Sequence, residues 1–183
     1  DIAPMAGVRE MLAGAKAHQG RQAEQADRFA VEKPIRADVP LMGETVTVYG
    51  RMDAFMDGEP PCVEEIKLCH APPEAPQPEH LAQARLYGAL LCLGAPLAAV
   101  DIRVSYVDEA GCLLREFAAL ETREALLSVL EGLLSPWLAF AVPERERRQL
   151  RDASLKAMAF PFPNYRAGQR ELAVQVYTAI TRK

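Results

Sequence analysis

The stretch TVTVYGRMDAFMDGEPPCVEEIK, residues 45–67, decides the fold predicted for this chain. It reads as a strand that ends at Asp53, a turn rich in glycine and proline, and a second strand through Glu65, Ile66 and Lys67. Because side chains alternate across a strand, Glu65 and Lys67 project from one face and Ile66 from the other. A hairpin brings Asp53 beside them, so that two carboxylates and an ammonium converge. Such a group suits holding a divalent cation against a phosphate.

Two sequence elements, one within this stretch and one after it, carry a family resemblance. Asp53 and the later Glu65-x-Lys67 resemble the Asp…(Asp/Glu)-x-Lys signature of the PD-(D/E)XK nuclease superfamily. Further along, Gln83-x-x-x-Tyr87 is similar to the Gln-x3-Tyr element of the RecB-like branch of that superfamily. The resemblance implies that Asp53, Glu65 and Lys67 are catalytic. It implies also that Gln83 and Tyr87 bind the substrate.

An upstream element extends the resemblance to the first predicted helix. Gly14-x-x-x-His18 resembles the Gly-x3-His element of the RecB-like branch, whose histidine binds metal. A lone histidine is more often solvated or at the edge of a core, and that alternative stays open. The resemblance implies a site for Mg²⁺ or Mn²⁺ formed by His18, Asp53, Glu65 and the carbonyl of Ile66.

The function implied by the resemblance is metal-dependent hydrolysis of phosphodiester bonds in DNA. Single-stranded ends are frequent substrates in this branch, so we expect exonuclease action or flap trimming in DNA repair. The ion would neutralise charge on the phosphate, and Lys67 would orient a water and stabilise the transition state. One alternative is a catalytically silent DNA-binding module that feeds substrate to a helicase. Another is an unrelated α/β domain, in which His18, Asp53 and Glu65 would lie far apart.

The residues assigned to substrate binding also have plainer interpretations. Glu79, Gln83 and Tyr87 recur every four residues on a predicted helix and form one polar stripe. This stripe faces either the cleft, as the resemblance implies, or solvent. Arg51 shares the face of Asp53 on its predicted strand. It contacts either a phosphate or an ordinary ion-pair partner.

Hydrophobic periodicity and turn residues place the other elements in the order helix, three strands, helix, two strands and helix. This order fits the α/β fold that the resemblance implies, a restriction-endonuclease-like mixed central β-sheet flanked by helices. The predicted helices cover residues 5–27, 79–93 and 123–140, and the predicted strands lie at 29–39, 45–53, 65–67, 98–107 and 112–120. We expect one nuclease domain over residues 1–157.

The composition is that of an ordinary globular domain, with 50% hydrophobic and 25% charged residues among 183. The net charge of −4 argues against a coating of basic residues for non-specific nucleic-acid binding, although a groove can be basic on an acidic protein. No run of about eighteen apolar residues and no signal peptide occur, so we expect a cytoplasmic protein without a membrane partner. Because the chain begins at Asp1 rather than Met, we expect a trimmed or processed fragment.

The four cysteines, Cys62, Cys69, Cys92 and Cys112, form no C-x-x-C pair. Some RecB-like relatives clamp an iron–sulfur cluster with four cysteines, one before the core and three grouped after it. The spacing in this chain does not match that pattern. We therefore expect no iron–sulfur cluster in this fragment, and free thiols in a reducing compartment.

The last segment, residues 158–183, has a different character. The sequence FPFPNYRAGQREL at 160–172 resembles the opening of DinG/XPD-like helicases, in which this pattern precedes the phosphate-binding loop. In that family the glutamine, here Gln169, helps to recognise adenine. No Gly-x4-Gly-Lys-Ser/Thr loop (Walker A) occurs in the chain, so we expect no ATP hydrolysis from this fragment. The resemblance implies the beginning of a helicase domain, whose missing remainder would be the partner of the nuclease domain.

Overall fold

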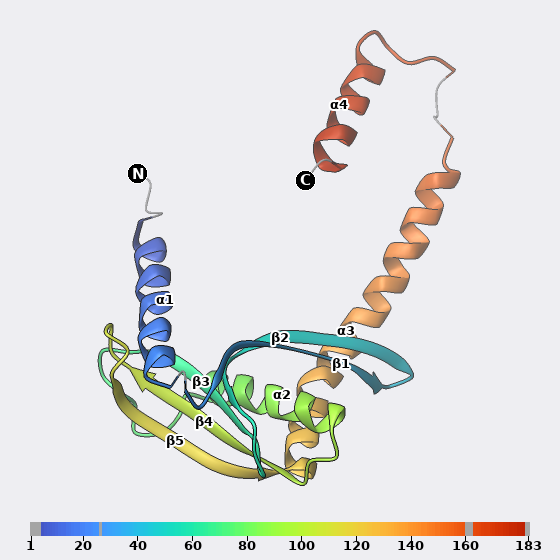
Figure 1. Ribbon diagram of the computed structural model, residues 1–183. Coiled ribbons are helices and arrows are strands. Elements are labelled where there is room, and N and C mark those ends of the chain that lie inside the picture. Colours follow the sequence, from blue (N-terminus) through green and yellow to red (C-terminus); the bar gives the residue numbers. More distant parts are fainter. Residues whose placement is uncertain (1–4, 26, 160–162, 182–183) are drawn as a thin grey trace. The chain divides into compact units, whose positions relative to one another are not determined.

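The computed structural model describes residues 5–25, 27–159 and 163–181, with side chains in the first helix described only for residues 13–23. Its sheet has five strands in the order β1-β2-β3-β4-β5 (Figure 1). Neighbouring strands are antiparallel except β3 and β4, which run parallel. The predicted α/β class, with a mixed central sheet flanked by helices, is confirmed, and it is compatible with a restriction-endonuclease-like fold.

The described elements follow the predicted order, with one further helix near the C-terminus. They are α1 (Met5–Gln25), β1 (Ala30–Leu41), β2 (Glu44–Met56), β3 (Cys62–Leu68), α2 (Pro78–Gly94), β4 (Ala99–Val107), β5 (Leu113–Thr122), α3 (Arg123–Ala157) and α4 (Gln169–Thr181).

A two-residue turn sets the register of the β1–β2 hairpin. Met42 and Gly43 have positive φ angles of 53° and 77°, and positive φ at both central residues is what a type I′ turn requires. The two strands then pair from Leu41 opposite Glu44 along most of their length. The turn expected between these strands is therefore confirmed.

The central strand β3 is buried on both faces of the sheet. Its residues from Cys62 to Ile66 are all buried, and they divide between two hydrophobic clusters. Val63 belongs to a cluster with residues of α2, β4 and α3, whereas Cys62 and Ile66 pack with Ala17 of α1. Since alternate residues of a strand face opposite sides, α2 covers one face of the sheet and α1 the other.

Helix α3 is longer than predicted. The sequence predicts a helix that ends near Phe140, but the observed helix continues through Pro143 for several further turns. Glu144 forms ion pairs with Arg147 at 2.9 Å and with Arg148 at 3.1 Å, one turn along the helix. The residues after the proline are mostly strong helix formers. Their propensity and these pairs sustain the helix beyond the point where a proline usually ends it.

The chain divides into two compact units, Asp1–Ala139 and Phe140–Lys183. The first unit holds the sheet, and the second holds α4, in which no described side chain is buried. The boundary predicted between residues 157 and 158 falls at the end of α3 and stays a prediction. Residues 160–162 of the helicase-like pattern lie outside the described residues. Gln169 of that pattern accepts a hydrogen bond from the backbone N–H of Arg166 at 3.1 Å.

Among the described helices, α3 is the one that length and composition alone would allow to cross a membrane. On it, Leu126 and Leu130 are 0% and 2% exposed and pack in the core of the first unit. A core helix passes the same test, so this finding is weak evidence for a membrane span. The expected absence of a membrane partner stays a prediction.

Helix α1 approaches the turn between β4 and β5 through two glycines. A Cβ atom on Gly20 would overlap the carbonyl oxygen of Ala110. Gly111, with a φ of 90°, lies against Gly20 in return. This close approach fixes the part of α1 that carries His18 and Arg21. A side chain at Gly20 would therefore push that part of the helix away from the sheet.

Gly20→Ala should destabilise the fold, whereas Gly14→Ala in the same helix should not. The added methyl at Gly20 has no room and should cost about 1–3 kcal/mol of unfolding free energy. At Gly14 no described atom lies within 4 Å of an added Cβ, so better helix propensity should contribute about 0.5–1 kcal/mol. Urea unfolding followed by circular dichroism measures both. Equal stabilities for the two variants would contradict the packing described for α1.

Candidate functional site

Asp53 lies where strands β2 and β3 stop pairing. The pairing runs only from Met56 back to Ala54, which leaves Asp53 and Glu65 at the next position of the same register. The backbone pairing of the two strands does not continue here. Asp53 Oδ2 instead accepts a hydrogen bond from the Ile66 N–H at 2.9 Å. The carboxylate thus takes the place of a β2 backbone carbonyl as the acceptor for this N–H of β3. It occupies the opening between the two strands.

His18 reaches Asp53 from helix α1. Its Nδ1 is 3.8 Å from Asp53 Oδ1, and its side chain is 24% exposed. Gln22, one turn further along the helix, donates from Nε2 to the backbone carbonyl of Asp53 at 2.9 Å. Two contacts therefore tie α1 to one residue of β2. The predicted approach of His18 to Asp53 is observed.

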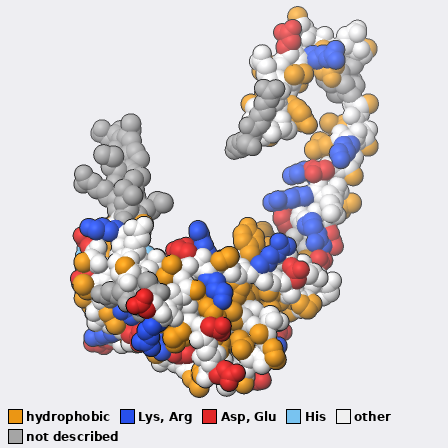
Figure 2. Space-filling model, viewed as in Figure 1, with side chains coloured by type: hydrophobic (Ala, Val, Ile, Leu, Met, Phe, Trp, Pro, Cys, Tyr) orange, Lys and Arg blue, Asp and Glu red, His pale blue; other side chains and the backbone are white. Residues whose placement is uncertain are grey.

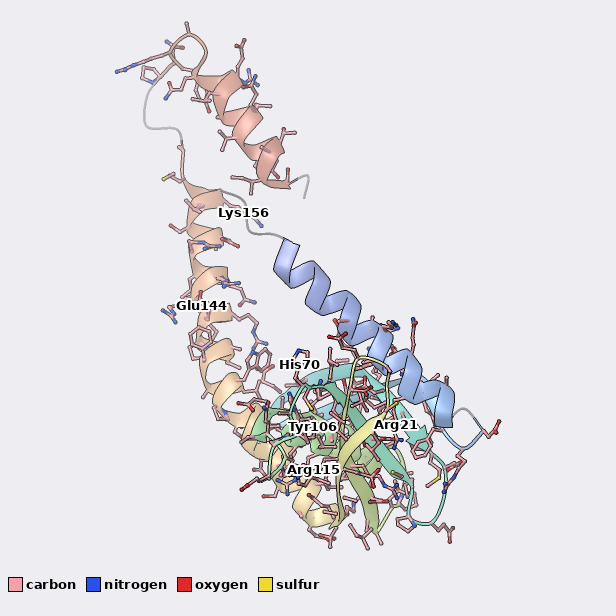
Figure 3. The ribbon with its side chains drawn as sticks, turned by 90° about the vertical axis from the view of Figure 1, so that its left-hand side faces the viewer. Arg21, His70, Tyr106, Arg115, Glu144 and Lys156 are labelled. Atoms are coloured by element: carbon pink, nitrogen blue, oxygen red, sulfur yellow. The ribbon has the colours of Figure 1, made fainter. Side chains whose placement is uncertain are left out.

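A buried ion pair that the sequence did not indicate holds the same helix against β3. Glu64 is 0% exposed, and its Oε1 accepts hydrogen bonds from Ser105 Oγ at 2.5 Å and from Arg21 at 3.3 Å. Figure 3 shows Arg21 where α1 meets the sheet. Glu64 and Glu65 are adjacent in β3, so they project to opposite faces. Removing one partner of such a pair costs about 3–5 kcal/mol, because the other charge stays buried.

Glu65 and Lys67 form a close ion pair on the face of β3 that α2 covers. Lys67 Nζ is 2.6 Å from Glu65 Oε1, and it also donates to Gln83 Oε1 at 3.4 Å. Glu65 is fully buried, and its Oε2 has no hydrogen-bond partner among the described residues. A buried carboxylate oxygen without a partner is costly. It therefore retains the capacity to bind a cation.

Burial raises the pKa of both acids in the site. Desolvation is the largest cause for Glu65, and the neighbouring Asp53 adds to it, so that the pKa rises to about 7 although Lys67 lowers it. The pKa of Asp53 is also raised, because burial outweighs the hydrogen bond from Ile66 and the charges of His18 and Lys67. Two adjoining carboxylates that resist ionisation become charged more readily when further positive charge is added. A divalent cation would supply that charge.

The three residues predicted to bind substrate lie in different surroundings. Gln83 on α2 contacts Lys67, so its part of the polar stripe faces the site. Tyr87 is half-buried and packs on a glycine of β2 at the rim of the core. Arg51 has a 67% exposed side chain and lies 3.1 Å from Glu32, which matches the ion-pair alternative. Contacts of these residues with DNA stay predictions.

The structure adds one residue to the metal-binding group, Glu32 of β1. His18, Glu32 and Asp53 each offer a ligand atom, and these atoms all lie within 4.8 Å of one another. Glu32 was not predicted, because no element of the family resemblance lies on the first predicted strand. Counting outward from the two-residue turn at 42–43 places Glu32 opposite Asp53, so the signal was present in the sequence.

The residues predicted to be catalytic or to bind metal therefore lie next to one another. Asp53 contacts His18 and Ile66 and adjoins Glu65, which is paired with Lys67. The alternative of an unrelated domain required His18, Asp53 and Glu65 to lie far apart, and they do not. Ile66 donates its N–H to the site, and its carbonyl remains a predicted metal ligand.

A cavity of about 340 Å³ lies at the other end of β3, bordered by Pro60, Pro61, Leu97 and Leu120. Its lining is mostly apolar and contains none of the predicted site residues. Catalysis of a hydrolytic reaction needs charged and hydrogen-bonding groups. The carboxylate site, and not this cavity, therefore offers the groups that such a reaction would need.

The four cysteines are free thiols. Cys62 and Cys92 are buried, and burial raises the pKa of the Cys62 thiol to about 12. A buried thiol of this kind stays protonated and unreactive at neutral pH. The expectations of no iron–sulfur cluster and of a reducing compartment remain predictions.

Comparison with known proteins finds similar solved structures but no sequence relative. No family model and no curated protein matches this chain. The crystal structure of SSO0001 is similar with a TM-score of 0.52 and 18% sequence identity, over 73% of this chain. This chain spans 61% of the length of that structure. At this identity the likeness supports the fold alone.

Glu65→Gln should change the pH dependence of stability in buffer that contains a metal chelator. The pKa of Glu65 is raised in the folded chain from 4.5 to about 7, so the folded state holds this proton more tightly than the unfolded state. The stabilisation is fully present below about pH 4.5 and is lost as the pH rises to about 7. Its size is on the order of 3 kcal/mol.

Urea unfolding at intervals from pH 5 to pH 8 measures this effect. The free energy of unfolding should fall more steeply with pH for the wild type than for Glu65→Gln. The same substitution at the exposed Glu59, in the turn before β3, is the matched control and should follow the wild type. Parallel profiles for wild type and Glu65→Gln would show that the buried acid does not hold its proton in this way.

Proposed function

We propose that this chain is a divalent-metal-dependent deoxyribonuclease. One observation carries the proposal: Asp53 contacts His18 and adjoins Glu65, whose ion-pair partner is Lys67. Two acids, an imidazole and an ammonium at one point are groups that metal-assisted phosphodiester hydrolysis uses. Their order along the chain agrees with the resemblance to RecB-like PD-(D/E)XK nucleases.

The donors of the site fit Mg²⁺ or Mn²⁺. Carboxylate oxygens suit both ions, and imidazole is a common ligand of first-row metals. Asp53, Glu65 and His18, with the carbonyl of Ile66, would hold the ion. The unpartnered and fully buried Oε2 of Glu65 supports this fit, because a cation would compensate it. When bound, the ion neutralises charge that develops on the phosphate and promotes attack by water.

Lys67 is the residue of this chain that acts on water and phosphate. Its ammonium is held between Glu65 and Gln83, and its side chain is 25% exposed, so it is both fixed and accessible. A charged donor that is already in position stabilises developing negative charge without reorganisation. Lys67 would orient the attacking water through a hydrogen bond. Asp53 keeps its place because Ile66 occupies one of its two oxygens.

The substrate we propose is DNA, attacked at single-stranded ends. Figure 2 shows Lys and Arg side chains interspersed with Asp and Glu over the first unit, without a broad basic field on this face. Such a surface suits a short contact with a strand end better than extensive non-specific binding to duplex. The activity would be exonucleolytic or flap trimming. We place it in cytoplasmic DNA repair beside a DinG/XPD-like helicase.

Asp53→Asn and Lys67→Ala should each lower the rate of DNA cleavage by about a hundredfold or more, because each removes charge that the transition state needs. Degradation of end-labelled single-stranded DNA in Mn²⁺ measures the rate. Circular dichroism checks that each variant is folded. Lys156→Ala, at an exposed lysine of α3, is the matched control and should cleave like the wild type.

The alternative of a silent DNA-binding module makes the opposite forecast. It requires that the wild type binds single-stranded DNA and leaves it intact in Mg²⁺ and in Mn²⁺. Wild-type rates in folded Asp53→Asn or Lys67→Ala would refute the assignment of these two residues as catalytic.

A further inference from the structure

Glu32 extends a row of carboxylates across three strands. The β1–β2 register places Glu32 opposite Asp53. The β2–β3 register, continued by one position, places Glu65 opposite Asp53 on the other side. Acidic side chains in neighbouring positions of a sheet repel one another. Protons or cations among its members therefore stabilise the row on β1, β2 and β3.

The backbone of Glu32 brings its carboxylate into this group. Glu32 has a φ of 51° within β1, and it is skipped in a ladder whose neighbouring residues pair on both sides. A left-handed conformation is unfavourable for a non-glycine residue. In that conformation, Glu32 offers a ligand atom within 4.8 Å of those of His18 and Asp53.

Two positively charged side chains, Arg51 and Lys67, lie at the two ends of the row. Arg51 lies 3.1 Å from Glu32, and Lys67 lies 2.6 Å from Glu65. The middle acid, Asp53, has the imidazole of His18 at 3.8 Å. Beside Asp53, the fully buried Glu65 has an Oε2 without a hydrogen-bond partner among the described residues, as has Glu64 on the opposite face. Because Glu65 adjoins Asp53, its Oε2 is a second observation that points to a cation next to the middle acid.

We propose that Glu32 is a ligand of the divalent cation, together with His18 and Asp53, and that it exchanges Arg51 for the cation when the cation binds. The inference rests on the proposed nuclease function, because it concerns the same metal site. Arg51 has a 67% exposed side chain, so its guanidinium would be available to a phosphate oxygen of the DNA after the exchange. Binding of the divalent cation would thus free Arg51 to contact the DNA strand.

Titration of the 183-residue chain with Mn²⁺ alone, followed by calorimetry or by the spin resonance of the unbound ion, tests the proposal. Glu32→Gln should weaken Mn²⁺ binding at least about tenfold. Glu32→Asp, which keeps the carboxylate, should weaken Mn²⁺ binding less than Glu32→Gln does. Asp38→Asn is the control on the same strand, where the carboxylate accepts a hydrogen bond from Thr47, and it should bind like the wild type.

A second comparison isolates the exchange with Arg51. Arg51→Met should tighten Mn²⁺ binding severalfold, because the competing cation is gone. In the Glu32→Gln background, the same change should have no effect. An equal effect in both backgrounds would mean that Arg51 acts only through its long-range charge, and it would overturn the exchange.

The result for Asp53→Asn separates this inference from the proposed function. Loss of Mn²⁺ binding in Asp53→Asn with unchanged binding in Glu32→Gln would overturn the role of Glu32 alone. Unchanged binding in Asp53→Asn would overturn the metal site itself. Losses in both Glu32→Gln and Asp53→Asn would support Glu32 as a ligand.

Discussion

The hydrogen bond from the Ile66 N–H to Asp53 Oδ2 is the contact on which the site depends. It replaces a backbone bond at the point where β2 and β3 separate, so the strands diverge without leaving the donor on β3 unsatisfied. At this point helix α1 brings an imidazole to Asp53 of β2, and α2 brings an amide to Lys67 of β3. In a fully paired β2–β3 ladder, a backbone carbonyl and not the Asp53 carboxylate would accept from Ile66.

Two adjacent glutamates of β3 show how one strand serves stability on one face and chemistry on the other. Oε1 of Glu64 accepts hydrogen bonds from Arg21 and Ser105, and this network anchors α1. Glu65, equally buried, is paired with Lys67. Each of the two glutamates keeps an Oε2 without a hydrogen-bond partner among the described residues, so the difference between them lies in their surroundings. Glu65 adjoins the second acid Asp53, which raises its pKa further, and we interpret these two adjoining acids as the capacity for a metal ion.

Much of the fold could be predicted from the sequence, because its signals are local. Alternation of side chains and turn residues located the strands, and the two-residue turn between β1 and β2 determined their register. The extension of α3 through Pro143 was not predicted, since ion pairs and helix propensity outweighed the proline. Asp53, Glu65 and Lys67 could be found because the resemblance rests on them. The ion pair between Arg21 of α1 and Glu64 of β3 could not be predicted, because it depends on which residues of α1 face β3.

Anomalous diffraction from a crystal soaked in Mn²⁺ tests the metal site most directly. We expect a strong anomalous peak within about 2–2.6 Å of a carboxylate oxygen of Asp53, with a ring nitrogen of His18 and an oxygen of Glu65 also in reach. A peak bound elsewhere on the chain would contradict it. So would a well-ordered site in which Asp53 and Glu65 hold no ion at a saturating Mn²⁺ concentration.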